Sequence, residues 1–297
     1  MCGIVGLFAK TKSFENELGL HFSKMLEEMT DRGPDSAGFA MYHNAVDAGR
    51  VKVVVLARDS LDSIILADKL SSVFSEASVS DLGSGHLLIT VASEIDELMT
   101  WLRTEHPELT VLSAGRSIEI YKEKGLPNKV IEEFSIASMS GSHALGHTRM
   151  ATESAITTAH SHPFSTGDDV CLVHNGSLSN HNRLRTELRK KGIYFSSDND
   201  SEVAAGYLTW RLREGDSIDE ALNRALSDLD GFYTFAVGTR DGFAVMRDPI
   251  ACKPAVISET DDWGAMASEY RAIALLPNAN NAPAWEPNPG QVYSWSH

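Results

Sequence analysis

The spacing of apolar and polar residues predicts a strand, a helix and a second strand at the start of the chain. Residues 2–9 are apolar with two glycines, a pattern typical of a buried strand whose backbone is closely approached. Apolar residues recur at helical spacing over 14–29 and stop before the turn-forming segment 31–34. Residues 36–43 then predict a short strand.

A middle stretch, about 49–133, has a pattern of its own and predicts a small α/β subdomain inserted in the chain. Its order is β-α-β-α-β-β, and a turn at 125–128 leads back out of it. The predicted elements are a strand at 51–57, a helix at 61–74, a strand at 86–92, a helix at 94–103 and strands at 109–112 and 118–121. We recognise no group of potentially catalytic residues in this stretch.

Strands dominate again after residue 144, and helices interrupt them. Strands are predicted at 144–150, 170–174, 232–238 and 243–247, and helices follow Ser179 and Asn180, then at 201–215 and 218–229. The chain thus has two runs of predicted strands separated by helices.

Composition narrows the possible partners and the compartment. The 297 residues include 26 Lys and Arg against 41 Asp and Glu, a net charge of −15 that opposes nucleic acid and anionic membranes. No apolar run approaches the roughly 20 residues of a membrane span, and no secretory signal is seen. The three cysteines have no paired spacing, so we expect reduced thiols in a cytoplasmic protein and neither disulfides nor a cysteine zinc site.

Cys2 directly follows the initiator methionine. Removal of Met1 would leave a thiol and a free α-amino group on one residue, with ordinary pKa values near ~8.5 and ~7.7–8.0, so that the amine could take the thiol proton. On its own, Cys2 could equally be a small apolar residue opening a buried strand. Other motifs must decide between these interpretations.

Two motifs offer a loop and a carboxylate-binding group. Arg32, Gly33 and Asp35 belong to the turn-forming segment 32–38, which could close over a ligand. Arg149 ends the predicted strand at 144–150, and its guanidinium could grip a carboxylate through two parallel hydrogen bonds. The alternative for Arg149 is a surface salt bridge.

Two further motifs offer an oxyanion hole and an ammonium-binding group. The Asn175 amide and the Gly176 N–H could converge on a tetrahedral oxyanion, although Asn-Gly is also the commonest tight-turn pair. Asp200 opens a predicted helix and could receive an α-ammonium group, or could simply stabilise the helix start. With Arg149, Asp200 would select a free amino acid.

Together the motifs resemble the class II glutamine amidotransferases, which are N-terminal nucleophile hydrolases. The similarity covers about 1–48 and 140–297, and the matching segments occur in the family's order at 2–6, 32–38, 146–149, 174–176, 200–202, 247–254 and 267–269. The resemblance implies an α+β fold, a four-layer α-β-β-α sandwich, over 1–297, with 49–133 as an addition absent from the simplest relatives.

The resemblance also implies roles for individual residues. Cys2 would attack glutamine, its own amine would act as base, and Asn175 and Gly176 would form the oxyanion hole. Arg149 and Asp200 would bind the two ends of glutamine, with His174 and Thr152 beside them, under a loop of Arg32, Gly33 and Asp35. Ammonia would leave first, and water would then hydrolyse the glutamyl thioester. Met150 and Glu153 depart from several relatives, which bears on gating more than on hydrolysis.

The histidines raise the alternative of a metal site. His160 and His162 flank Ser161 and would share one face of a strand, but no carboxylate or cysteine stands at matching spacing. We therefore favour a structural role and expect no metal. His143 and His147 likewise look like core or channel-wall residues.

Within the family, the chain resembles the amidotransferase subunit of split glutamate synthase-like systems, including N-methylglutamate synthase. That resemblance implies L-glutamine as substrate and a hetero-oligomer with synthase subunits that carry the flavin and the iron–sulfur cluster, with no cofactor on this chain. Segment 49–133 would be a docking surface. Two alternatives stay open: a self-sufficient N-terminal nucleophile hydrolase acting on another amide, and a non-catalytic assembly subunit.

Overall fold

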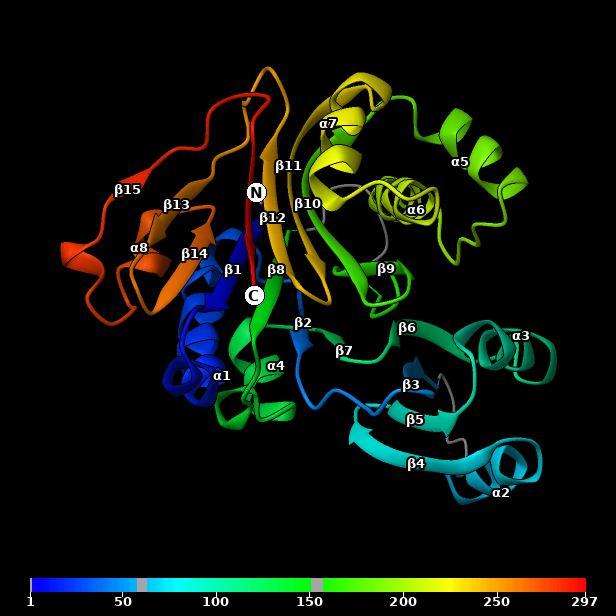
Figure 1. Ribbon diagram of the computed structural model, residues 1–297. Helices are drawn as coiled ribbons and strands as arrows, with labels where there is room; N and C mark the ends of the chain where they lie inside the picture. Colours follow the sequence, from blue (N-terminus) through cyan, green and yellow to red (C-terminus); the bar gives the residue numbers. More distant parts are fainter. Residues whose placement is uncertain (1, 58–62, 151–156) are drawn as a thin grey trace.

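The computed structural model describes residues 2–57, 63–150 and 157–297 (Figure 1). Two antiparallel sheets lie face to face in its main body. The seven-stranded sheet has the order β15-β13-β14-β1-β8-β2-β7 and the five-stranded sheet the order β16-β12-β11-β10-β9. Their strands are β1 Gly3–Ala9, β2 Ser36–Tyr42, β7 Ile118–Lys124, β8 His143–Arg149, β9 Phe164–Gly167, β10 Val170–Leu178, β11 Gly231–Thr239, β12 Gly242–Arg247, β13 Val256–Glu259, β14 Trp263–Ala267, β15 Ala284–Trp285 and β16 Val292–Ser296.

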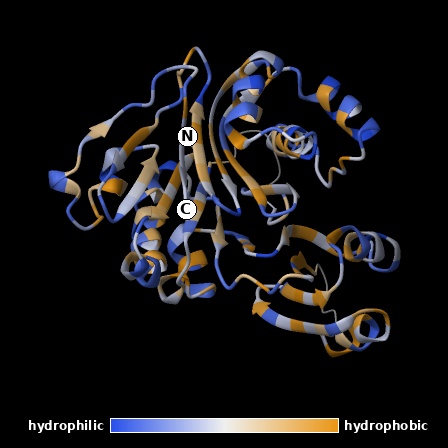
Figure 2. Ribbon diagram, viewed as in Figure 1, coloured by the Kyte–Doolittle hydropathy of each residue, from blue (hydrophilic) through white to orange (hydrophobic). Residues whose placement is uncertain are grey.

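Helices cover the outer face of each sheet. The seven-stranded sheet is covered by α1 Lys12–Glu28, α4 Pro127–Glu133 and α8 Tyr270–Ile273, and the five-stranded sheet by α5 His181–Lys190, α6 Asp200–Arg213 and α7 Ile218–Asp228 (Figure 1). Three apolar cores result, one between the sheets and one under each helical layer. The predicted four-layer α-β-β-α sandwich is thus confirmed. Hydrophilic colour dominates the outlying α5, and hydrophobic colour the strands of the layers (Figure 2).

The inserted subdomain is a third sheet with two helices. Its order along the chain is β3 Arg50–Leu56, α2 Ser63–Val73, β4 Ser75–Gly83, β5 His86–Ala92, α3 Ile95–Glu105 and β6 Thr110–Gly115. All three strand pairs are antiparallel and the spatial order is β4-β5-β3-β6, which is the split β-α-β-β-α-β arrangement. Figure 1 shows it attached below the five-stranded sheet.

The structure corrects two details of the predicted subdomain. Strand β4 was not predicted, because most of its side chains are exposed and its short apolar face, Ala77 and Val79, is only partly buried. Strand β7, predicted as part of the subdomain, instead pairs with β2 at the edge of the seven-stranded sheet. The third sheet therefore ends at residue 115, and the rest of 49–133 belongs to the main body.

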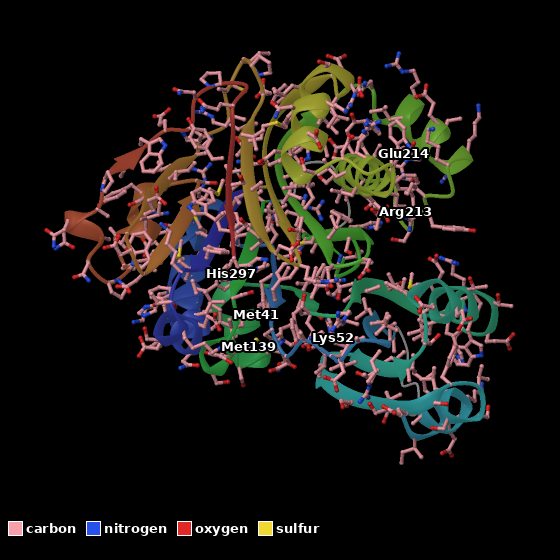
Figure 3. The ribbon with its side chains drawn as sticks, in the orientation of Figure 1. Met41, Lys52, Met139, Arg213, Glu214 and His297 are labelled. Carbon is pink, nitrogen blue, oxygen red and sulfur yellow. The ribbon has the colours of Figure 1, made fainter. Side chains whose placement is uncertain are left out.

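The two faces of β3 have different partners. Val51, Val53 and Val55 pack under α2 and α3, whereas Val54 and Leu56 join the core between the main sheets. Lys52 lies on this second face, between the subdomain and the main body (Figure 3).

Lys52 forms a buried ion pair with Glu119 of β7, and the Nζ–Oε1 distance is 2.6 Å. The Tyr121 hydroxyl also donates to Glu119, and His43 Nε2 lies 3.0 Å from its Oε2. Burial opposes the charge on Glu119, but the bond and charge of His43 and the charge of Lys52 outweigh it and lower the pKa of Glu119 to about 2. The subdomain is therefore joined to the body by a charged contact as well as by apolar packing.

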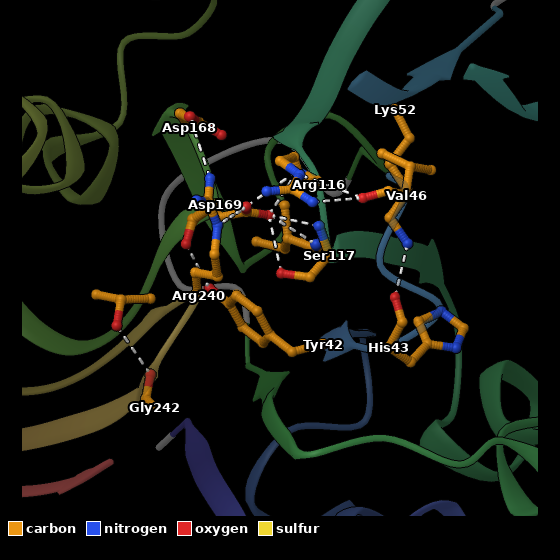
Figure 4. Close-up of polar contacts among 12 residues, drawn as sticks. Tyr42, His43, Val46, Lys52, Arg116, Ser117, Asp168, Asp169, Arg240 and Gly242 are labelled. Carbon is orange, nitrogen blue, oxygen red and sulfur yellow. Dashed lines mark hydrogen bonds and ion pairs between the residues drawn. The ribbon is translucent and has the colours of Figure 1, made fainter. Parts of the chain in front are cut away.

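A second connection is built on Asp169, which is 1 % exposed. Its carboxylate accepts hydrogen bonds from the backbone N–H groups of Arg116, Ser117 and Ile118 at 2.8–3.0 Å, and from Arg240 Nε at 2.8 Å (Figure 4). Burial would raise the pKa of Asp169, but these donors hold it below its usual value. Residues 116–118 connect β6 of the subdomain to β7, so Asp169 fixes the exit of the chain from the subdomain.

Candidate active site

Cys2 lies at the entrance of β1, where the two main sheets meet. Its carbonyl oxygen accepts hydrogen bonds from Arg32 Nε at 3.0 Å and from Asn175 Nδ2 at 3.2 Å. Arg32 ends the short helix at Thr30–Arg32, and Asn175 lies on β10 of the opposite sheet. Three segments that are distant in sequence therefore meet at the predicted nucleophile.

The start of β1 is fixed on both sides. Ile4 N–H donates to Ser268 Oγ, and Ser268 N–H donates to the Ile4 carbonyl, both at 2.9 Å. On the other side β1 pairs with β8, with Ile4 opposite His147 and Gly3 opposite Thr148. Directly opposed residues point to one face of a sheet, and Ile4 points into the core between the sheets. Cys2 and His147 therefore share that inner face.

The Cys2 thiol is acidic in this environment. Burial acts to raise its pKa, but a hydrogen bond with His147, the charge of His147 and a hydrogen bond from the Met150 backbone outweigh burial and lower the pKa to about 6. At neutral pH the side chain is therefore mostly thiolate, the form that attacks carbonyl carbon.

The segment from Arg32 to Asp35 packs along the end of β8. Arg32 also forms an ion pair with Glu269, at 2.6 Å between Nη1 and Oε1. A Cβ on Gly33 would lie 2.3 Å from the Thr148 carbonyl carbon, so only glycine permits this approach. Asp35 N–H donates to the Arg149 carbonyl at 3.1 Å. The structure thus brings the predicted loop to Cys2; its closure over a ligand stays a prediction.

Asn175 and Gly176 occupy a strand and not the two-residue turn that was the alternative. Gly176 has φ +148°, and a Cβ there would lie 2.0 Å from the Phe232 carbonyl oxygen. This is a conformation that favours glycine. Their role as an oxyanion hole stays a prediction, but the position of Asn175 beside Cys2 fits it.

Asp200 and His174 are tied to the same strand end. Asp200 is the first residue of α6, and its Oδ2 accepts the Leu178 N–H at 2.8 Å. His174 Nδ1 lies 2.8 Å from Ser201 Oγ. Burial lowers the pKa of His174 to about 4, against the opposing charge of Asp200, so His174 is neutral at pH 7.

Arg149 ends β8 opposite Ser36 and is 7 % exposed, so it is not the surface arginine of the alternative interpretation. It lies two residues beyond His147, on the same inner face of the sheet. Thr152, the remaining predicted substrate-binding residue, lies outside the described residues.

Sequence reasoning placed His147 in the core or a channel wall and gave it no role at Cys2. The side chain is indeed buried, but it also acts to lower the pKa of the Cys2 thiol, and its ring stacks on that of His162 with 4.0 Å between centroids. The signal was present in the strand pattern, since His147 and Arg149 are two residues apart on one strand and must share a face.

Lys122 of β7 was also missed. It is 3 % exposed, and its Nζ donates to the carbonyls of Ala159, Ser161 and Pro163 at 2.9–3.3 Å. Burial lowers its pKa to about 8. Lys122 thus holds the segment that carries His162 against the inner face.

The site is rich in cations although the whole chain is acidic. Arg32 and Arg149 lie at Cys2 and at the end of β8, Lys122 and Arg149 both act to lower the pKa of the buried His162, and Lys253 acts likewise on His174. Such a site favours anionic groups, including a substrate carboxylate and a thiolate.

Metal and membrane binding were also considered for the described residues. In 2–57, 63–150 and 157–297, no three His, Cys, Asp or Glu side chains are grouped as metal ligands. His160, which was considered with His162, instead has its Nδ1 2.9 Å from Thr157 Oγ1. No helix within these same ranges is long and apolar enough to cross a membrane.

Known proteins resemble this chain in sequence and in fold. Residues 147–275 match the family model described as "Glutamine amidotransferase domain". The chain is 51 % identical to the glutamine amidotransferase-like protein GlxB of Rhizobium meliloti, over 100 % of this chain and 99 % of that protein. It is 30 % identical to a putative glutamine amidotransferase of Methanothermobacter thermautotrophicus, over 99 % of each.

A solved structure, glutamine phosphoribosylpyrophosphate amidotransferase from B. subtilis, shares the fold. The TM-score is 0.61 at 20 % identity, covering 99 % of this chain and 47 % of that one. The chain thus spans about half the length of that enzyme.

Proposed function

Because the chain belongs to the class II glutamine amidotransferases, we propose that it hydrolyses L-glutamine to glutamate and ammonia with Cys2 as nucleophile. The observation that carries this proposal is the environment of Cys2. Its thiol is acidic, and its carbonyl oxygen accepts hydrogen bonds from Arg32 and Asn175. We infer glutamine as the substrate from the family, and Cys2 as the attacking group from the surroundings of its thiol.

In the proposed reaction the Cys2 thiolate attacks the side-chain amide carbon of glutamine. The oxygen that becomes negative is stabilised by the Asn175 amide and the Gly176 N–H, a contribution typically worth ~10²–10³ in rate for each donor. The nitrogen leaves as ammonia once it has received a proton, and water hydrolyses the remaining thioester.

Arg149 and Asp200 would select the amino-acid end of the substrate. The buried Arg149 provides a fork for the α-carboxylate, and Asp200, fixed at the start of α6, accepts the α-ammonium group. Their charges are opposite, so a substrate lacking either group would lose one ionic contact.

We propose further that the ammonia passes to a separate synthase subunit of a glutamate synthase-like or N-methylglutamate synthase complex. In such a complex the flavin and iron–sulfur cluster would lie on the partner, and the inserted subdomain would be the docking surface. Support comes from the subdomain itself, which has a complete fold and two helices facing away from the main sheets.

Glutamine hydrolysis is tested by glutamate release and by intact mass after treatment with a glutamine-analogue inactivator. We expect one adduct on Cys2, and Cys2→Ala should lose both the adduct and at least ~10³-fold of the activity. Cys252→Ala is the matched control, since Cys252 is also an unpaired cysteine but is exposed. Labelling that survives Cys2→Ala would contradict the proposal.

The same assay, run with the chain alone and with co-purified partners, tests the complex. Activity that rises with a flavin-bearing partner, and falls again when the inserted subdomain is deleted, is expected. A deletion variant that still assembles would refute the docking role while leaving glutamine hydrolysis intact.

A further inference from the structure

We propose that His147 is a second catalytic base of this site, which accepts the Cys2 thiol proton independently of the α-amino group. The inference rests on the proposed function for the identity of the nucleophile and deepens it by naming a residue of the chemical step. It removes the requirement that the thiol be activated only by its own residue's amine.

The strand register places the two side chains together. Cys2 precedes Gly3, which is opposite Thr148, and His147 is the residue before Thr148 on β8. Cys2 and His147 are therefore diagonal neighbours on the inner face, at a spacing that aromatic side chains can bridge. His147 also acts to lower the pKa of the Cys2 thiol.

The imidazole is held from its other side. His162 stacks on it at 4.0 Å, and neither His162 ring nitrogen has a hydrogen-bond partner among the described residues. Burial and the neighbouring positive groups hold the pKa of His162 well below its usual value, so it stays neutral. Lys122 fixes the His162 segment through three carbonyls. His147 thus has a neutral neighbour and a defined orientation toward Cys2.

The proton balance closes without another reactant. The S–H bond of Cys2 breaks, its proton moves to the His147 ring, and a thiolate–imidazolium pair results. When the tetrahedral intermediate collapses, the C–N bond breaks and the imidazolium can return the proton to the departing nitrogen.

The other charged groups around Cys2 act on the same equilibrium. Arg32 approaches from the short helix and Arg149 from the end of β8, and the charge of the N-terminus also favours the thiolate. Asp200 and Lys253, which both influence His174, approach from α6 and from the segment after β12. These groups stay in place when His147 is replaced, so a variant isolates the contribution of His147.

The test is the pH dependence of Cys2 alkylation by iodoacetamide, located by mass spectrometry. The wild-type midpoint is expected near pH 6, and His147→Gln should move it up to roughly 8, toward the ordinary thiol value. His147→Asn should shift the midpoint in the same direction, and it replaces His147→Gln in the test if that variant folds poorly. Alkylation reports on the thiol without any glutamine turnover. A failure of the proposed glutamine hydrolysis can therefore be told apart from a failure of the role proposed for His147.

His143→Gln is the matched control. His143 is a buried histidine on the same strand and the same face, at the far end of β8, and its Nε2 lies 2.9 Å from the Thr239 carbonyl oxygen. Its alkylation midpoint should stay near that of wild type. An unshifted midpoint in both folded His147 variants would overturn the proposal and assign the thiol proton to the α-amine alone. Persistence of the low midpoint in molecules that retain Met1, scored in the same spectra, would support His147.

Discussion

Replacing Asp169 by asparagine should weaken the attachment of the inserted subdomain by about 3 kcal/mol. The change keeps the shape but puts an NH₂ group where Oδ2 now accepts from Arg240. Because the Arg240 side chain is 44 % exposed, we assign only about 1 kcal/mol to that ion pair. The lost negative charge that faces three buried backbone N–H groups accounts for roughly 2 kcal/mol more.

The effect of Asp169 should depend on pH in a defined direction. Its pKa is lower in the folded chain than in the unfolded one, so its stabilisation is fully present above the unfolded value of about 3.9 and is lost as pH falls through the folded value. The free-energy difference between wild type and Asp169→Asn should therefore be constant from pH 5 to 7 and shrink below pH 4. Urea unfolding followed by circular dichroism measures it at each pH.

Asp168→Asn is the control for this prediction. Asp168 is adjacent and also pairs with Arg240, at 3.4 Å, but its side chain is 50 % exposed. It should change the free energy of unfolding by less than about 1 kcal/mol. Equal losses in the two variants would refute the argument that the buried N–H groups make Asp169 important.

Two further substitutions test packing at the site and at the subdomain. Gly176→Ala should lower the free energy of unfolding by about 3 kcal/mol because the added Cβ would lie 2.0 Å from a backbone atom. Gly192→Ala is the control, and it should cost about 1 kcal/mol because Gly192 has φ +80° but no atom within 4 Å of the added Cβ. Indistinguishable urea midpoints for the two variants would contradict this prediction. Lys52→Met should cost about 3 kcal/mol because the buried Glu119 carboxylate loses the Lys52 cation and keeps only His43 as a charged neighbour. Lys52→Met combined with Glu119→Leu should recover part of the loss. A double variant as unstable as the sum of both single changes would show that the pair does not act as a unit.

Local pattern sufficed for the elements of the main body. The strand predicted at 2–9 is β1 at Gly3–Ala9, and the helix predicted at 14–29 is α1 at Lys12–Glu28. β1 is a continuous apolar run that is buried throughout, and α1 has apolar residues at helical spacing on one buried face, which are both patterns that local sequence carries. Strand β4 is mostly exposed and has only a short, partly buried apolar face, so its existence depends on pairing with β5, which no local pattern records.

The site was predictable as a set of motifs but not as a geometry. Cys2, Asn175 and Arg32 were each identified, and the structure brings them to one carbonyl oxygen. The contact of His147 with Cys2 depends on the register between β1 and β8, and register is set by the whole sheet. Lys122 was missed for the same reason, since β7 was placed in the wrong sheet.

The position of Cys2 between distant segments makes its reactivity a property of the completed fold. The His147 side chain and the Met150 backbone lower the pKa of its thiol, and neither lies beside Cys2 until β8 has paired with β1; the Asn175 contact needs the opposite sheet as well. A nascent or partly folded chain carries an ordinary thiol that is mostly protonated at neutral pH. The chain thus stays unreactive toward electrophiles and oxidants during synthesis, and the acidic thiol appears only in molecules whose last strands, including the one before Ser268, are in place.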